Sequence, residues 1–101
     1  MAAALILEFD GGTEDEYRAV SKELGIDLDT GTGDWPEGLI THSGGINDAG
    51  NLVVMEVWDT PEHQARFMDG RLTEAMARAG VTREPASVTW IELTAHHHVG
   101  G

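Results

Sequence analysis

The chain has 101 residues, of which 41% are hydrophobic, and its eighteen acidic and six basic side chains give a formal net charge of −12. This length suits a single domain over residues 1–101, and the apolar fraction is sufficient for a packed core. The acidic balance argues against partners that carry rows of phosphates, so we expect neither nucleic-acid binding nor membrane binding.

Cysteine is absent, which excludes disulfides, thiolate chemistry and cysteine–zinc sites and fits a cytoplasmic protein. The first ten residues, MAAALILEFD, contain an apolar run without a basic start, and they reach Glu8 and Asp10 early. We therefore expect a first strand over Ala3–Phe9, and neither a signal peptide nor a membrane span.

The segment after the first strand is predicted to form a helix over Glu14–Leu24. Thr13 and Glu16 have the spacing of a capping box at its start, and Gly25 offers a left-handed end. Its apolar face consists of three residues at helical spacing: Tyr17, Val20 and Leu24. The acidic, glycine-rich stretch that follows lacks the closing glutamate of a calcium loop, so we expect a plain loop.

The second half of the chain is predicted to hold three strands and one helix. The strands are Gly38–Ile46, Leu52–Asp59 and Ser87–Ala95, with the hairpin loop NDAGN between the first two. The helix begins at Pro61, is interrupted near Gly70 and ends at Gly80. The order β-α-β-β-α-β predicts a ferredoxin-like α+β fold, a four-stranded antiparallel sheet with two helices on one face.

Alternation along the strands divides their residues between the two sheet faces. One set is almost wholly apolar and is assigned to the face under the helices: Leu5, Leu7, Phe9, Leu39, Val53, Met55, Val57, Ile91 and Leu93. The other set mixes apolar, aromatic and acidic side chains: Ile6, Glu8, Ile40, His42, Val54, Glu56, Trp58, Trp90 and Glu92. Ligand pockets have such a mixture, so we expect this second face to form a pocket against a second copy, in a homodimer.

The hairpin predicts a catalytic pair within that pocket. If its five-residue loop is closed by Ile46 and Leu52, His42 lies opposite Glu56, whose carboxylate would orient the imidazole as a general base. A register shift of two residues would pair His42 with Val54 or Trp58 instead. The two glycines that follow Ser43 are interpreted as letting the strand bend or bulge so that a barrel can close.

The remaining residues of the mixed face are predicted to bind a small hydrophobic or aromatic molecule. These substrate-binding candidates are Trp58, Trp90, Ile6, Ile40, Val54, Glu8 and Glu92. The alternative for the tryptophans is packing at a dimer interface, and Tyr17 is interpreted as a core contact of the first helix. None of the six basic residues lies in a predicted strand, which argues against a strongly anionic substrate.

Three segments, LEFDGGTEDEYRAV, EVWDTPEHQARFMDGRL and IELTAHHH, together with the order of elements, resemble the antibiotic-biosynthesis-monooxygenase-like group of the dimeric α+β barrel superfamily. The resemblance implies a homodimer whose two sheets close into a barrel. It also implies small-molecule chemistry, since the superfamily includes cofactor-free monooxygenases acting on aromatic polyketides, haem-degrading enzymes and isomerases. The strongest of the three segments, EVWDTPEHQARFMDGRL, is a degenerate motif, so it indicates the fold better than the reaction.

No cofactor and no metal are expected. Haem-degrading relatives use a helical histidine as iron ligand, whereas the matching helix here offers Asp69 and Gly70, and His63 lies too close to the helix start. The DGG and SGG glycines are turn glycines and not a dinucleotide-binding loop. The run from His96 to His98 is interpreted as an exposed tail that binds zinc or nickel only adventitiously.

The sequence therefore predicts a cofactor-independent enzyme, monooxygenase-like or an isomerase or cyclase, acting on an apolar, aromatic or polyketide-like substrate. His42, assisted by Glu56, would remove a phenolic or α-carbonyl proton. The alternative is a non-catalytic dimer that binds a small hydrophobic ligand in the same pocket.

Overall fold

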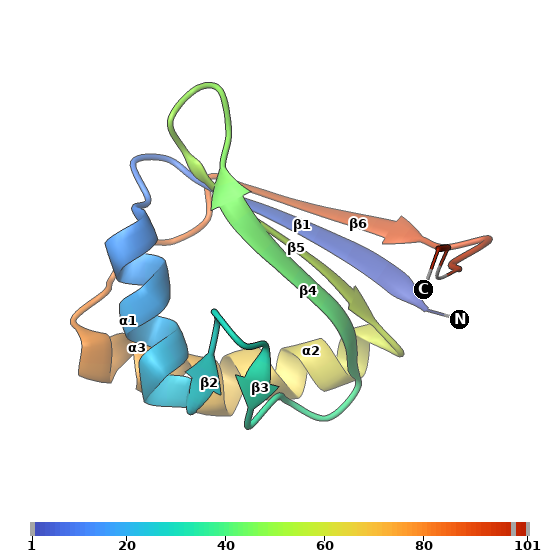
Figure 1. Cartoon of the computed structure of the whole chain (residues 1–101), viewed down its shortest axis with the longest axis horizontal. Helices are drawn as coiled ribbons and strands as arrows, with labels where there is room; N and C mark the ends of the chain where they lie inside the picture. The colour runs from blue at the N-terminus through green and yellow to red at the C-terminus, as the bar shows by residue number, and fades with distance from the viewer. Residues whose placement is uncertain (1, 98, 101) are drawn as a thin grey trace.

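A computed structural model describes residues 2–97, 99 and 100 of the chain. His98, the last member of the histidine run, lies outside the described residues. Four strands form one antiparallel sheet in the order β4-β5-β1-β6, with the helices gathered on one face (Figure 1). The strands are β1 Ala3–Phe9, β4 Leu39–Ile46, β5 Leu52–Trp58 and β6 Ser87–Glu92. This arrangement confirms the predicted ferredoxin-like α+β fold, although β6 ends before the predicted boundary at Ala95.

The first helix, α1 Glu14–Leu24, begins and ends as predicted. The Thr13 hydroxyl accepts from the Glu16 backbone N–H at 3.1 Å, and the Glu16 carboxylate accepts from the Thr13 N–H at 3.1 Å, which completes the capping box. Gly25 ends the helix with a φ of 80°, a left-handed conformation that glycine adopts without a steric cost.

The second helical segment runs from Pro61 to Ala79 in three parts: α2 Pro61–Phe67, a π-helical turn η1 Met68–Leu72, and α3 Thr73–Ala79. The predicted interruption near Gly70 is this π turn, in which the helix widens without ending. Such turns occur often at functional sites. The side chain of Arg71 projects from the turn and donates to the carbonyls of Leu24 and Asp34 at 3.1 and 2.7 Å.

A small hairpin that the sequence did not predict follows α1. Its strands are β2 Ile26–Asp27 and β3 Thr32–Gly33, and it lies beside the end of α1 and in front of the second helical segment (Figure 1). Two-residue strands carry too little alternation to be recognised from a sequence. Arg71 ties this hairpin region to the helices, because its two acceptors lie on either side of the hairpin.

The side chains of β5 face the opposite way from our prediction. Val54, Glu56 and Trp58 are buried under the helices, whereas Met55 is 51% exposed on the open face. The prediction failed because the strand, LVVMEVW, is apolar on both alternating sets, and the set without a carboxylate was assigned to the core. The β1 assignment was right, since Leu5 is buried and lies directly opposite Glu56.

Strand β4 changes face because it carries one extra residue. Leu39 pairs with Trp58, but Thr41 already pairs with Val57, which leaves Ile40 as a bulge. Leu39 and His42 therefore both point toward the helices, and Ile40 is 46% exposed. We predicted a bend or bulge at the two glycines after Ser43, but the bulge lies at Ile40.

Strand β6 extends past the cover of the helices, and all six of its residues are exposed. Ile91, which we predicted to be under the helices, pairs with Ala4 and faces away from them, and Leu93 follows the strand and is only partly buried. The core therefore lies under β1 and β5. It consists of Leu5, Leu7, Leu52, Val54 and Trp58.

Candidate functional site

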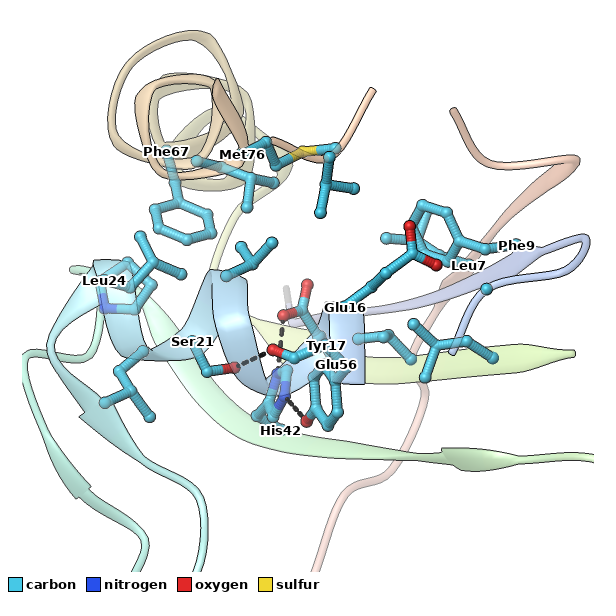
Figure 2. A pocket seen from close by; sticks show the side chains of 18 of the residues that line it. Leu7, Phe9, Glu16, Tyr17, Ser21, Leu24, His42, Glu56, Phe67 and Met76 are labelled. Carbon is cyan, nitrogen blue, oxygen red and sulfur yellow. Dashed lines mark hydrogen bonds and ion pairs between the residues drawn. The ribbon is translucent and has the colours of Figure 1, made fainter. Parts of the chain in front are cut away.

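An apolar cavity of about 130 Å³ lies between the helices and the sheet of a single chain (Figure 2). Leu7, Val54 and Leu52 form part of its wall on the sheet, and Phe67 and Met76 form part of its wall on the helices. Our prediction placed the pocket on the other sheet face, between two subunits. The reversed orientation of β5 and the bulge at Ile40 account for the difference, because they turn the polar set toward the helices.

The predicted pairing of His42 with Glu56 across the hairpin is confirmed. The histidine Nδ1 lies 2.9 Å from Glu56 Oε2, and the two side chains are only 15% and 10% exposed. Trp58 Nε1 donates to the other carboxylate oxygen at 3.1 Å. Because a carboxylate only accepts, Nδ1 carries the proton and Nε2 of the neutral imidazole is an acceptor.

Tyr17 completes the group from α1. Its hydroxyl lies 2.5 Å from His42 Nε2, so the phenol donates to the histidine, and the dashed contacts in Figure 2 run from His42 to both Tyr17 and Glu56. Burial raises the pKa of Tyr17, the negative charge of Glu56 raises it further, and Arg18 lowers it. The phenol therefore keeps its proton near neutral pH.

Sequence analysis placed Tyr17 on the correct helix face but missed this contact. The only signal in the sequence was the hydroxyl of Tyr17, a polar group on an aromatic residue of the helix face that packs on the sheet. Gly44 makes the contact possible, because a Cβ at that position would lie 2.6 Å from the tyrosine ring. The ring of Trp35 also lies against His42, with centroids 5.3 Å apart.

Four further polar residues that the sequence did not single out for the site line the cavity: Glu16, Ser21, Gln64 and Arg83. Arg83 Nε donates to Glu16 at 3.3 Å, and its Nη1 donates to the carbonyl of Asp10 at 2.9 Å. Within the described chain, none of the basic residues lies in a strand, as predicted, but Arg83 reaches the cavity from the loop before β6. Its charge is balanced by Glu16.

The predicted substrate-binding residues are dispersed. Val54 lines the cavity, and Trp58 lies behind Glu56 as its hydrogen-bond donor, fully buried. The other five do not line this cavity in the part of the chain that is described: Ile6, Ile40, Glu8, Trp90 and Glu92. Glu8 accepts instead from the side-chain amide of Asn51 at 2.9 Å.

A second hollow of about 290 Å³ lies outside the first, bordered by α1 and β4. Tyr17, Trp35 and His42 line both spaces. Leu52 lines both as well, so these four residues border the inner cavity and the outer hollow.

The other described histidines lie elsewhere. His63 is held at the start of α2, where Nδ1 contacts Asp59 at 2.6 Å. Within residues 2–97, 99 and 100 there is no cluster of three side chains suited to hold a metal ion. None of the described helices is both long and apolar enough to cross a membrane.

Comparison with known proteins identifies the fold. No protein-family model and no curated protein sequence matches the chain. A solved structure of a candidate antibiotic biosynthesis monooxygenase from Chloroflexus aurantiacus J-10-fl is 17% identical, with a TM-score of 0.66 over 99% of this chain and 100% of that one. Rv0793 from Mycobacterium tuberculosis is 14% identical, with a TM-score of 0.63 over 97% and 100%.

A candidate antibiotic biosynthesis monooxygenase from Deinococcus radiodurans is also 14% identical, with a TM-score of 0.56 over the whole of both chains. At such low identities the likeness establishes the fold alone. The chain therefore has an antibiotic-biosynthesis-monooxygenase-like, ferredoxin-like fold.

Proposed function

We propose that this protein is a cofactor-independent enzyme that removes a proton from a small, apolar ring compound, with His42 as general base and Glu56 as its partner. One observation carries the proposal: a shielded histidine–carboxylate pair lines an apolar cavity. Buried pairs of this kind hold one tautomer and one ring orientation, which prepares Nε2 to accept a proton.

The substrate proton can reach Nε2 by two routes. The substrate hydroxyl or C–H can displace the Tyr17 hydroxyl and bind Nε2 directly. Alternatively, Tyr17 passes its own proton to Nε2 while its oxygen takes the proton of the substrate. Both routes leave an imidazolium beside the Glu56 carboxylate, which stabilises the new charge at 2.9 Å.

The fate of the resulting phenolate or carbanion defines the reaction. In the monooxygenase version, O₂ converts a ring CH₂ to a carbonyl: one oxygen atom enters the product, the other leaves as water, and the substrate supplies the electrons. In the isomerase or cyclase version, the anion is reprotonated at another atom or closes a ring. The shared step is the proton removal by His42.

The cavity volume limits the substrate. An apolar cavity of roughly 150 Å³ in another protein binds benzene, so about 130 Å³ suits one six-membered ring. A polyketide-like substrate with several rings requires the outer hollow as well, and the side chains of Tyr17, Trp35 and His42 border both spaces.

We further propose that the protein is a cytoplasmic homodimer. The open sheet face presents apolar side chains to solvent, among them Met55 and Ile91, and has no cover within the described chain. If a second copy packed against this face through its own open face, the exposed apolar side chains of both subunits would be buried. Light scattering tests this directly, because a stable monomer at micromolar concentration would contradict the dimer.

The second candidate is a non-catalytic protein that binds a small hydrophobic ligand. It is favoured by the contact of Tyr17 with Nε2, since both ring nitrogens of His42 are occupied in the ligand-free protein. If ligands bind without displacing Tyr17 and without exchanging protons, this second function holds.

The test combines two readouts on one-ring compounds. Cyclohexanone in D₂O reports removal of the α-proton by deuterium incorporation, and a series of substituted phenols reports oxygenation by O₂ uptake and product mass. We expect the wild type to accelerate at least one of these reactions and His42→Ala to lose the effect. Equal rates for both proteins would overturn the assigned base.

A further inference from the structure

Gln64 lies on the wall of the cavity that α2 forms. Its side chain is 7% exposed and lines the cavity together with Phe67, which lies one turn further along the same helix. The helix position is fixed at both sides of Gln64, because Thr60 caps the start and Phe67 packs on Trp58 with ring centroids 5.9 Å apart.

The amide of Gln64 has no hydrogen-bond partner among the described residues, yet no side-chain nitrogen or oxygen in that part of the chain is both fully enclosed and unpaired. The amide of Gln64 therefore keeps some accessible surface, on a side chain that lines the cavity. A nearly buried polar group without a protein partner costs stability unless water or a polar ligand atom bonds to it.

The polar groups of the cavity fall on different walls. Tyr17 and His42 come from α1 and β4, whereas Gln64 comes from α2. The charged pair of Glu16 and Arg83 is already satisfied internally. Ser21 also lines the cavity, but its hydroxyl donates to the backbone carbonyl of Tyr17 at 2.9 Å. Gln64 is thus an uncharged polar side chain of this cavity that has no hydrogen-bond partner among the described residues.

We propose that Gln64 determines specificity: the natural ligand carries two oxygen functions on one ring, one placed at Tyr17 and His42 and a second, uncharged hydroxyl or carbonyl placed at Gln64. The inference deepens the proposed function and rests on its cavity. An amide both donates and accepts, so it pairs with either group. An apolar substituent at that position would leave the Gln64 amide without a hydrogen-bond partner, so such a ligand should bind less tightly.

The test uses ligand pairs that differ in one polar group. The three dihydroxybenzenes are compared with the three methylphenols of the same substitution, in oxygen-free buffer, by calorimetric titration. Wild type, Gln64→Met and the control Leu72→Met are measured, where Leu72→Met alters the same cavity wall without removing a polar group. For at least one isomer, the preference for hydroxyl over methyl should fall by about threefold to tenfold in Gln64→Met alone.

The outcomes separate the two proposals. An unchanged preference in Gln64→Met for all three isomers would overturn the role of Gln64 and leave the proposed function standing. Failure of wild type to bind any of the six compounds would contradict the proposed function and this inference together. The thermal midpoint without ligand should be equal to or above that of wild type, because no protein contact is lost. A clear fall would instead assign Gln64 a structural role and contradict the inference.

Discussion

His42 and His63 each contact a carboxylate, and comparing these two pairs shows what distinguishes a candidate site. His42 lies 2.9 Å from Glu56 and His63 lies 2.6 Å from Asp59, so the shorter contact belongs to His63. Glu56 is buried, whereas Asp59 is substantially exposed at the start of α2. Only His42 of the two lines the cavity and contacts a tyrosine, whereas Nε2 of His63 lies 3.7 Å from the exposed carboxylate of Glu37.

The difference teaches that the contact distance alone does not identify chemistry. The Asp59–His63 pair fixes a helix start, where Thr60 also accepts from the His63 backbone N–H. The Glu56–His42 pair lines an apolar cavity, and both side chains are largely shielded from solvent. The measurements below distinguish the two pairs.

The largest stability effect is expected for the carboxylates. Glu56→Ala leaves His42 Nδ1–H and Trp58 Nε1–H without acceptors in a buried site, which should cost about 2–4 kcal/mol. Asp59→Ala should cost clearly less, because solvent reaches His63. Urea unfolding of both variants checks this, and an equal loss would remove the distinction between the two pairs.

The next effect concerns the contact that only His42 has. Gly44→Ala would place a Cβ 2.6 Å from the Tyr17 ring, so the ring must shift away. We expect a loss of about 1–3 kcal/mol. Gly45→Ala is the matched control, because a Cβ there meets nothing within 4 Å, and it should change stability by less than about 0.5 kcal/mol. Similar stability losses for the two variants would contradict the close contact between Gly44 and the Tyr17 ring.

The titration of Tyr17 can be followed by itself, because it is the only tyrosine of the chain. The phenolate absorbance should rise with a midpoint above the ordinary pKa of 10.0, because burial and then the charge of Glu56 raise the Tyr17 pKa. Glu56→Gln should lower this midpoint and Asp59→Asn should leave it unchanged. A wild-type midpoint at or below 10.0 would contradict the contact.

The same raised pKa has a consequence for stability. The folded protein holds the Tyr17 proton more tightly than the unfolded chain, so this contribution is fully present below pH 10.0 and is lost as pH rises through the folded pKa. Tyr17→Phe should remove this alkaline loss.

The smallest effect concerns the exposed pair. The hydrogen bond from His63 is the main cause that lowers the pKa of Asp59 below 3.8. Its contribution to stability is therefore present above that pH and is lost as pH falls through the folded pKa. The stability difference between wild type and Asp59→Asn should shrink between about pH 5 and pH 2. If the stability difference between the two proteins grew as the pH fell, the lowered pKa of Asp59 would be contradicted.

The sequence predicted the fold and half of the site, for identifiable reasons. The length of the hairpin loop fixed the pairing of His42 with Glu56. The sheet face on which His42 and Glu56 lie was predicted wrongly. Nothing in the sequence marks the extra residue at Ile40, and both sides of β5 are rich in apolar residues. Tyr17 and Gln64 were missed because they belong to two helices, and no spacing along the chain relates them to a strand histidine.

In the function that we propose, His42 is the general base, and a contact with a carboxylate does not by itself give His63 that role. The most direct measurement is the rate of deuterium incorporation into cyclohexanone in D₂O for His42→Gln and His63→Gln against wild type. We predict a loss of about 100-fold or more for His42→Gln, and a rate within about twofold of wild type for His63→Gln. Equal rates for the two variants would contradict the account.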